Sequence, residues 1–327
     1  MRTRQGPTTE TIRAAVELAR RAPSVHNSQP WRWRLSGNEL HLHADQSRHL
    51  TATDPDQRAL TLSCGAALHH LRVTLAAQGW STEVAYLPHA QHPDHLATLR
   101  LAPHHPTSTD ISLTAAILHR HSDRRRFGNG QVPKTYLRAA TDYAVRFGAQ
   151  IHPIPDETRD YLGKLLREAV TRHHNDAHYQ IELSAWSGRR GGADGVPARN
   201  ATTPRPTETL PTREFADPVL IDTPLTDDAD WLLLSTPTDT PRTRLQAGET
   251  LSALLLAATD LGLATCIQTE PLGIPDLREE IRFSLCDGAF PQAMVRAGWM
   301  RPSAPPLPSA PRREVEAVLS ITDSPAN

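Results

Sequence analysis

Residues 20–35 read RRAPSVHNSQPWRWRL and connect three predicted elements. Residues 9–22 place apolar side chains at helical spacing, and Pro23 disfavours helical geometry in the residue before it, so a helix should end there. Beyond a polar loop, apolar and polar residues alternate through residues 31–35 and again through residues 39–45. This alternation predicts a β-hairpin. The stretch therefore predicts a helix, a polar loop and a hairpin in succession.

Composition narrows the class of partner. The 327 residues include 35 basic and 36 acidic ones, which removes a broad electrostatic reason to bind nucleic acid or a membrane surface. No apolar signal segment or run of about 18 apolar residues is present, and a cytoplasmic protein with a small-molecule partner is expected. The three cysteines lack CxxC spacing, and the histidine-rich runs at 89–95 and 173–178 lack HExxH spacing. We expect no metal site and interpret both histidine runs as exposed.

A repeat divides the chain into two related halves. Gly65 and Gly248 are each followed by leucine at the third and sixth positions and by glycine at the fourteenth, and each segment leads into a threonine-containing strand. Such self-similarity favours a duplicated architecture. The interpretation assigns residues 1–110 to an N-terminal half and residues 111–327 to a C-terminal half, within one intertwined unit.

Other elements follow from local patterns. Helical spacing spans residues 59–79, 156–183 and 244–262, and apolar strand patterns lie at 81–87, 94–102, 231–236, 265–268 and 293–299. A short helix is expected within residues 104–118. Residues 187–218 are rich in Gly, Pro, Thr and charge, and a loop of this length inside a compact domain is typical of a lid or of disorder.

The polar loop has a chemical interpretation of its own. Residues 23–29 offer a hydroxyl, two carboxamides and free backbone groups. Carboxamides both donate and accept hydrogen bonds, which suits the imide-type edge of a planar heterocycle. The alternative is that Asn27 and Gln29 cap neighbouring elements within a turn.

The pattern Pro23-Ser24-x-x-Asn27-x-Gln29-Pro30-Trp31 resembles the flavin-binding signature of the nitroreductase superfamily. In that family the loop contacts FMN and comes from the opposite subunit of an intertwined dimer. The resemblance implies that Ser24 and Asn27 contact the flavin. It also implies that the flavin is framed by Pro23, Val25 and Gln29.

A basic segment, RHSDRRRF at residues 120–127, resembles the RxSxR element of the same family, which holds the FMN phosphate. Arg120, Ser122 and Arg124 alternate, so they are expected to converge on one phosphate. The alternative is a solvated charged run. The resemblance also implies that Arg312 and Arg313 complete the phosphate site. It further places backbone N–H groups at the flavin's N5 edge, from Gln268, Thr269 and Glu270.

Each half carries only part of this site. The polar loop occurs only in the first half and the RxSxR-like element only in the second. One flavin per chain follows, with the halves packed as an internal pseudo-dimer, which resembles the Acg-like branch of the superfamily. The predicted fold is α+β, with mixed or antiparallel sheets around long core helices. The chain is expected to be a monomer or a homodimer.

Three functions remain open. The first is an FMN oxidoreductase that uses NAD(P)H to reduce a small planar acceptor, such as a nitro compound or quinone. The second is a flavin-sequestering protein whose lid, through Trp186 or a lid arginine, covers the ring. The third is a flavin-dependent tailoring oxidase. In each case the flavin carries the chemistry, and no catalytic side chain is predicted, because GxSxG is absent. The absence of GxGxxG argues against a Rossmann dinucleotide site.

Overall fold

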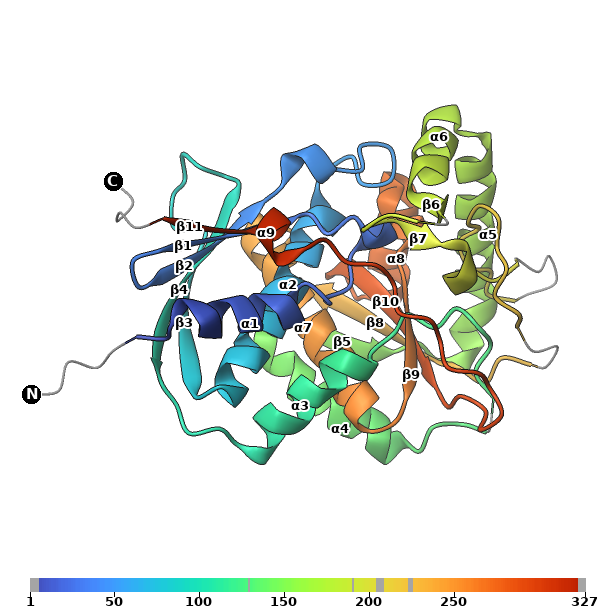
Figure 1. The fold of residues 1–327 in the computed structure, drawn as a ribbon. Coiled ribbons are helices and arrows are strands. Elements are labelled where there is room, and N and C mark those ends of the chain that lie inside the picture. The colour runs from blue at the N-terminus through green and yellow to red at the C-terminus, as the bar shows by residue number, and fades with distance from the viewer. Residues whose placement is uncertain (1–5, 129, 190, 204–208, 223–225, 323–327) are drawn as a thin grey trace, which may run out of the picture.

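The computed structural model describes residues 6–128, 130–189, 191–203, 209–222 and 226–322. Two β-sheets lie on either side of two long helices, α2 (Arg58–Ala77) and α7 (Pro241–Asp260) (Figure 1). This is the predicted α+β architecture with long core helices. Both helices are buried over most of their length, which explains why their apolar residues surround the helix and do not form one stripe.

The first sheet joins the two ends of the chain. Its strand order is β11-β1-β2-β4-β3, and the β1–β2 hairpin confirms the alternation that the sequence showed. The last strand was not predicted, and it pairs in parallel with the first, Trp33 opposite Leu319. The strands are β1 (Trp31–Ser36), β2 (Glu39–Ala44), β3 (Trp80–Tyr86), β4 (His95–Pro103) and β11 (Leu319–Thr322).

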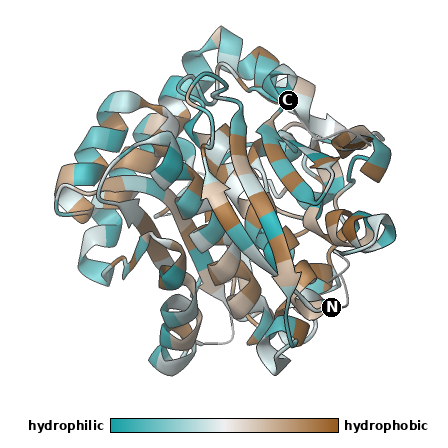
Figure 2. Ribbon diagram, turned by 90° about the vertical axis from the view of Figure 1, so that its left-hand side faces the viewer, coloured by the Kyte–Doolittle hydropathy of each residue, from teal (hydrophilic) through white to brown (hydrophobic). Residues whose placement is uncertain are grey.

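The second sheet is antiparallel throughout, in the order β5-β8-β10-β9. Its strands are β5 (Gln150–Pro153), β8 (Asp230–Thr236), β9 (Ala264–Gln268) and β10 (Phe290–Gly298). The residues of β8 and β10 are buried on both faces, whereas those of β3 alternate in exposure. Figure 2 faces the first sheet and shows hydrophobic and hydrophilic residues alternating along its strands.

The repeat glycines meet where α2 crosses α7. A Cβ atom on Gly65 would lie 2.0 Å from the carbonyl oxygen of Leu245, and one on Gly248 would lie 2.0 Å from that of Leu62. Each glycine therefore contacts the residue three positions before the other, which is the reciprocity of a two-fold contact. The self-similarity of the sequence thus corresponds to a symmetric helix crossing. The division at residue 110 stays a prediction.

The remaining helices surround these layers. Residues 156–183, predicted as one helical region, form two helices, because the Asp176 side chain accepts hydrogen bonds from the backbone N–H groups of His178 and Tyr179 and begins a new one. The helices are α1 (Thr9–Ala19), α3 (Ser108–His119), α4 (Lys134–Ala144), α5 (Arg159–Asn175), α6 (Ala177–Trp186), α8 (Pro275–Leu285) and α9 (Val315–Val318). No helix in the described ranges has the length and apolar character of a transmembrane segment.

The lid segment, residues 187–218, packs over the polar loop. It contains the short parallel pair β6 (Ser187–Arg189) and β7 (Val196–Pro197). Its Gly195 carbonyl accepts a hydrogen bond from Asn27, and its Ala193 carbonyl accepts one from Gln29. Residues 190 and 204–208 of the segment lie outside the described residues. The described part is a covering layer held by specific contacts.

Candidate functional site

The polar loop between α1 and β1 has an unusual backbone. His26, Asn27 and Gln29 have φ values of 50°, 54° and 51°, in the left-handed region that residues other than glycine rarely adopt. The Ser24 hydroxyl accepts a hydrogen bond from the Gln29 backbone N–H at 2.9 Å and fixes the turn. Backbone strain of this kind costs about 1–3 kcal/mol per residue and clusters at functional sites.

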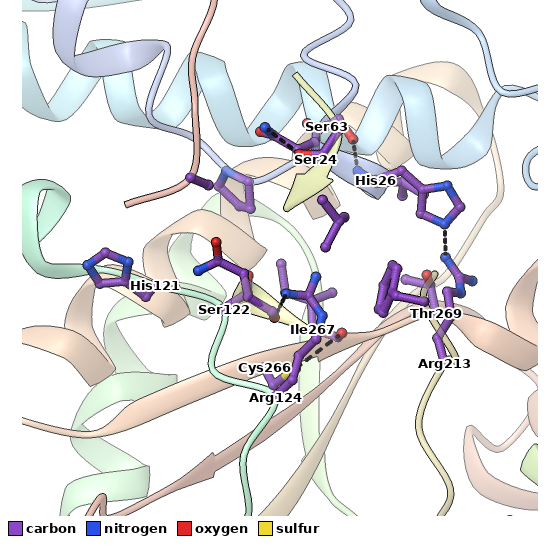
Figure 3. A pocket seen from close by; sticks show the side chains of 18 of the residues that line it. Ser24, His26, Ser63, His121, Ser122, Arg124, Arg213, Cys266, Ile267 and Thr269 are labelled. Carbon is purple, nitrogen blue, oxygen red and sulfur yellow. Dashed lines mark hydrogen bonds between the residues drawn. The ribbon is translucent and has the colours of Figure 1, made fainter. Parts of the chain in front are cut away.

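A pocket lies where this loop meets the second half of the chain (Figure 3). Its wall comes from the polar loop, residues 120–124, the end of β9, the lid segment and the C-terminal tail, together with residues 62–63 of α2 and residue 251 of α7. Eleven of the thirteen residues predicted from sequence line it: Pro23, Ser24, Val25, Asn27, Arg120, Ser122, Arg124, Gln268, Thr269, Glu270 and Arg312. The two incomplete half-sites therefore come together in one place.

Gln29 and Arg313 do not line the pocket. The Gln29 side-chain oxygen accepts a hydrogen bond from the Arg313 backbone N–H at 2.9 Å, and the Arg313 guanidinium turns toward the Asp45 carboxylate at 3.4 Å. Their predicted flavin-framing and phosphate-binding positions are wrong. They instead tie the tail to the polar loop, which sets the position of Arg312 next to them.

The Asn27 carboxamide is on the pocket wall, but its polar atoms already have partners. Its Nδ2 donates to the carbonyl oxygens of Gly195 at 3.1 Å and Pro311 at 3.0 Å, and its Oδ1 accepts from the Arg312 guanidinium at 2.9 Å. The alternative interpretation, a carboxamide that joins neighbouring segments, describes this side chain better than direct ligand contact does.

One end of the pocket holds buried arginines that lack a counter-charge. Arg120 and Arg312 each donate to the backbone carbonyl of Arg21, and no described carboxylate pairs with either. Burial and the neighbouring guanidinium groups lower the pKa of Arg120 to about 10 and that of Arg312 to about 9. The Nε and Nη1 atoms of Arg120 and the Nε of Arg312 are buried without a hydrogen-bond partner.

The nearest carboxylate in the sequence does not neutralise this cluster. Asp123 forms an ion pair with Arg125 at 2.8 Å. Burial and the same arginines also lower the pKa of His121, so this ring gains a proton less readily. A cavity with several guanidinium donors and no anion suits a phosphate, whose oxygens accept forked, charge-assisted hydrogen bonds.

Arg124 faces a different part of the pocket from Arg120. Its Nη1 donates to the Asn200 carbonyl at 2.9 Å, and its guanidinium lies 4.6 Å from the centre of the Phe215 ring. The predicted convergence of Arg120, Ser122 and Arg124 on one phosphate stays a prediction, since all three line the pocket but Arg124 has partners of its own. Burial lowers the pKa of this guanidinium too.

At the opposite end of the pocket, the buried Glu270 carboxylate and the Arg213 guanidinium compensate each other's charge. The Glu270 carboxylate binds Arg213 of the lid segment and accepts hydrogen bonds from His173 Nδ1 at 2.8 Å and Tyr179 Oη at 3.4 Å. Burial by itself would raise the pKa of Glu270, but Arg213 and His173 outweigh it and lower this pKa to about 2. The His173 and Tyr179 rings stack at 3.9 Å. The Glu270 side chain thus fastens the lid segment.

Several pocket residues were not predicted. His26 occupies an unspecified position of the loop pattern, and Arg213 and Phe215 lie in a segment without periodicity, where only its length suggested function. Figure 3 places His26 and Arg213 face to face at one end of the pocket, with His121 at the other. Trp186, the last residue of α6 before the lid segment, contacts Arg48 instead, with the guanidinium 5.1 Å from its ring centre.

The histidine runs are only partly exposed. His173 and His95 are buried, contrary to prediction, because one is paired with Glu270 and the other stacks on His43 at 4.4 Å. His89 and His92 are exposed as predicted. Within the described ranges, no group of three or more His, Cys, Asp or Glu side chains is arranged to hold a metal ion.

Comparison with known proteins places this site in a family. The chain is 42% identical over 318 residues to the Mycobacterium tuberculosis protein named "Putative NAD(P)H nitroreductase Rv3131", covering 96% of this chain and 92% of that one. It is 34% identical over 325 residues to "Putative NAD(P)H nitroreductase acg" of the same species, covering 96% of each. A search of protein-family models found no match.

Solved structures give more distant similarities. A Desulfitobacterium hafniense nitroreductase with bound FMN is 16% identical, with a TM-score of 0.39, and the match covers 60% of this chain and 92% of that one. The Mycobacterium smegmatis nitroreductase NfnB in complex with NADPH is 17% identical, with a TM-score of 0.38, covering 64% and 93%.

With a curated relative at 42% identity across nearly its whole length, the chain belongs to the nitroreductase superfamily, whose members depend on FMN. The internal repeat and the composite pocket agree with that assignment. Within the superfamily, the chain is a member of the Acg-like branch.

Proposed function

We propose that the chain binds one FMN and uses NAD(P)H to reduce a small planar acceptor, such as a nitro compound or a quinone. The observation that carries the proposal is the arginine cluster. Arg120 and Arg312 are buried without a carboxylate partner, and a phosphate would both neutralise them and accept from their unpaired N–H groups. FMN would bring that phosphate.

The rest of the pocket suits the remainder of the cofactor. Between its ends lie polar groups of Ser24, Ser122 and Gln268 beside the apolar side chains of Val25 and Ile267. Apolar walls with a few convergent polar groups are typical of sites for planar cofactors. When bound, FMN would supply hydride transfer, while Arg124 would provide a positive charge in the middle of the site.

The site requires no second chain. The polar loop of the first half and the basic segment of the second supply both parts of the wall within one polypeptide. We therefore propose that residues 1–110 and 111–327 act as the two subunits of a pseudo-dimer with one functional site. A monomer is sufficient for binding, whether or not two chains associate.

A second function, flavin sequestration, is favoured by the lid contacts. Arg213 is bound to a buried carboxylate, and Phe215 lies over Arg124, so the lid segment closes one end of the pocket. A lid that stays closed would retain FMN and exclude nicotinamide. A tailoring oxidase would use the same pocket with an internal substrate in place of nicotinamide.

Anaerobic reduction separates these functions. We expect the purified chain to be yellow, to contain FMN by mass spectrometry, and to lose its flavin absorbance within seconds of NADPH or NADH addition. If the flavin absorbance is retained after addition of both NADPH and NADH, while dithionite still reduces the protein, the result would contradict the reductase and favour sequestration or the oxidase. A chain with no affinity for FMN would exclude all three.

A further inference from the structure

His26 lies at the lid end of the pocket with one ring nitrogen engaged. Its Nε2 is 2.7 Å from Nη1 of Arg213, and its ring meets the Phe215 ring edge-on, with centroids 6.0 Å apart. The side chain is 4% exposed, so water does not solvate it freely. Its conformation is fixed by the left-handed backbone of the loop and by these two lid residues.

The contact with Arg213 determines which ring nitrogen carries the proton. A guanidinium only donates hydrogen bonds, so Nε2 of His26 must accept, and the proton of the neutral ring must be on Nδ1. Burial, followed by the charge of Arg213, holds the pKa of His26 well below its usual value, so the ring is neutral near pH 7. His26 is thereby fixed as an Nδ1–H donor.

That donor has no acceptor. Nδ1 of His26 is buried and has no hydrogen-bond partner. A buried donor without a partner costs about 1–3 kcal/mol, and His26 belongs to the pocket wall, so a ligand oxygen that reaches Nδ1 would remove this cost. We propose that His26 Nδ1–H donates a hydrogen bond to an oxygen of the electron acceptor, such as a quinone carbonyl or a nitro group. This inference rests on the proposed reductase function.

The surroundings favour an acceptor oxygen over a cationic group. The neighbouring positive charges are Arg213, which Glu270 neutralises, and Arg124, which no described carboxylate pairs with. Phe215 supplies an apolar edge against which a planar ring can pack. The lid end therefore combines a fixed donor, a net positive field and an aromatic surface, which together recognise a planar, oxygen-bearing ring.

The position of His26 assigns it to the acceptor and not to FMN. His26 and Arg213 lie at the opposite end of the pocket from His121, which adjoins the arginines that suit the phosphate (Figure 3). His26 also contacts two residues of the lid segment, Arg213 and Phe215, which close this end. His26 is thus a binding residue whose identity selects the class of acceptor.

Two matched variants test the inference. Asparagine and leucine have similar volumes, but only asparagine retains an N–H donor near the position of Nδ1. We expect His26→Leu to raise the dissociation constant of menadione about three- to tenfold, and His26→Asn to restore most of the affinity. Menadione is titrated into oxidised, FMN-loaded protein without NAD(P)H, and flavin absorbance is followed.

The ligand control is 2-methylnaphthalene, which has the same ring system without the oxygens. Its affinity should be the same in His26→Asn and His26→Leu. Equal menadione affinity in these two variants, or an equal loss for 2-methylnaphthalene, overturns the proposal. FMN content is measured in every sample, so loss of flavin binding, which would count against the proposed function, is not confused with loss of the acceptor contact.

The tautomer is a second readout that activity does not influence. In protein labelled with ¹⁵N-histidine, the His26 ring signals, identified by their absence in His26→Asn, should show a proton on Nδ1. The Nδ1 proton should shift when menadione is added to the holoprotein. A proton on Nε2, or a shift that accompanies FMN binding and does not change with menadione, contradicts the assignment.

Discussion

The two ends of the pocket are both built on buried arginines, yet their electrostatics are opposite. At the phosphate end, Arg120 and Arg312 contact only neutral oxygens, and burial lowers the pKa of each. At the lid end, Glu270 raises the pKa of Arg213 despite burial. The same residue type therefore marks an anion site in one place and a structural fastening in the other.

The difference shows that the counter-charge, and not the arginine, indicates ligand binding. An uncompensated buried cation destabilises the fold until an anion binds, so we propose that a ligand completes the phosphate end. A paired cation stabilises the fold without a ligand, so the lid end is complete in the chain itself. The two ends should respond differently to mutation.

The largest expected effect is at the lid end. Glu270→Gln removes the only carboxylate that Arg213 contacts in the described structure and leaves a buried charge without compensation. We expect the free energy of unfolding to fall by about 3–5 kcal/mol, measured by urea denaturation at pH 7. The double variant Glu270→Gln/Arg213→Met, which removes both charges, should recover much of that loss. If the single variant is as stable as the natural chain, the carboxylate does not hold the lid.

Low pH should remove the contribution that the ionised Glu270 carboxylate makes to the free energy of unfolding. The pKa of Glu270 is about 2 in the folded protein, below its ordinary value of 4.5, so the stability it provides is present above pH 4.5 and is lost as pH falls toward 2. The shift corresponds to about 3 kcal/mol. Urea denaturation at pH 7, 5, 4 and 3 should show the gap between the natural chain and Glu270→Gln narrowing below pH 4.5. A constant gap would contradict the low pKa.

A mutation that removes an arginine at the phosphate end should weaken FMN binding but should not lower the stability of the FMN-free protein. Arg120→Met should weaken FMN binding by about 1.5–3 kcal/mol, measured by calorimetry, because a charge-assisted contact is lost. The melting temperature of the FMN-free variant should be at least that of the natural chain, because a buried cation without a partner has been removed. Arg313→Met is the matched control, since its side chain faces Asp45 outside the pocket and its backbone N–H, which ties the tail to Gln29, is retained. Equal losses in both variants would contradict the assignment.

Local sequence patterns predicted much of the fold. Alternation gave the β1–β2 hairpin, and Pro23 marked the end of the first helical region, although α1 itself ends at Ala19. The repeat glycines, Gly65 and Gly248, proved to be the two residues in contact at the helix crossing. These features depend on neighbours a few residues apart, which is the range over which sequence patterns are informative.

Long-range contacts were harder to predict. Arg312 and Arg313 are adjacent in an extended tail, so consecutive side chains point in different directions, and only the packing of the tail shows that Arg312 faces the pocket. His173 was expected on the surface because nothing nearby in the sequence reveals Glu270 as its partner. Arg213 and Phe215 could not be assigned for the same reason.

The sequence by itself determined many of the elements, the family resemblance and eleven of the residues that line the pocket, and it predicted the duplication. Only the tertiary structure decided which arginines lack a counter-charge, which carboxylate fastens the lid segment, and which nitrogen of His26 carries its proton. The physical reason is that these properties depend on burial and on partners distant in the chain: Arg213 lies 57 residues from Glu270 and 187 from His26. Spacing along the sequence indicates which side chains are available, and folding determines their charge state and their partners.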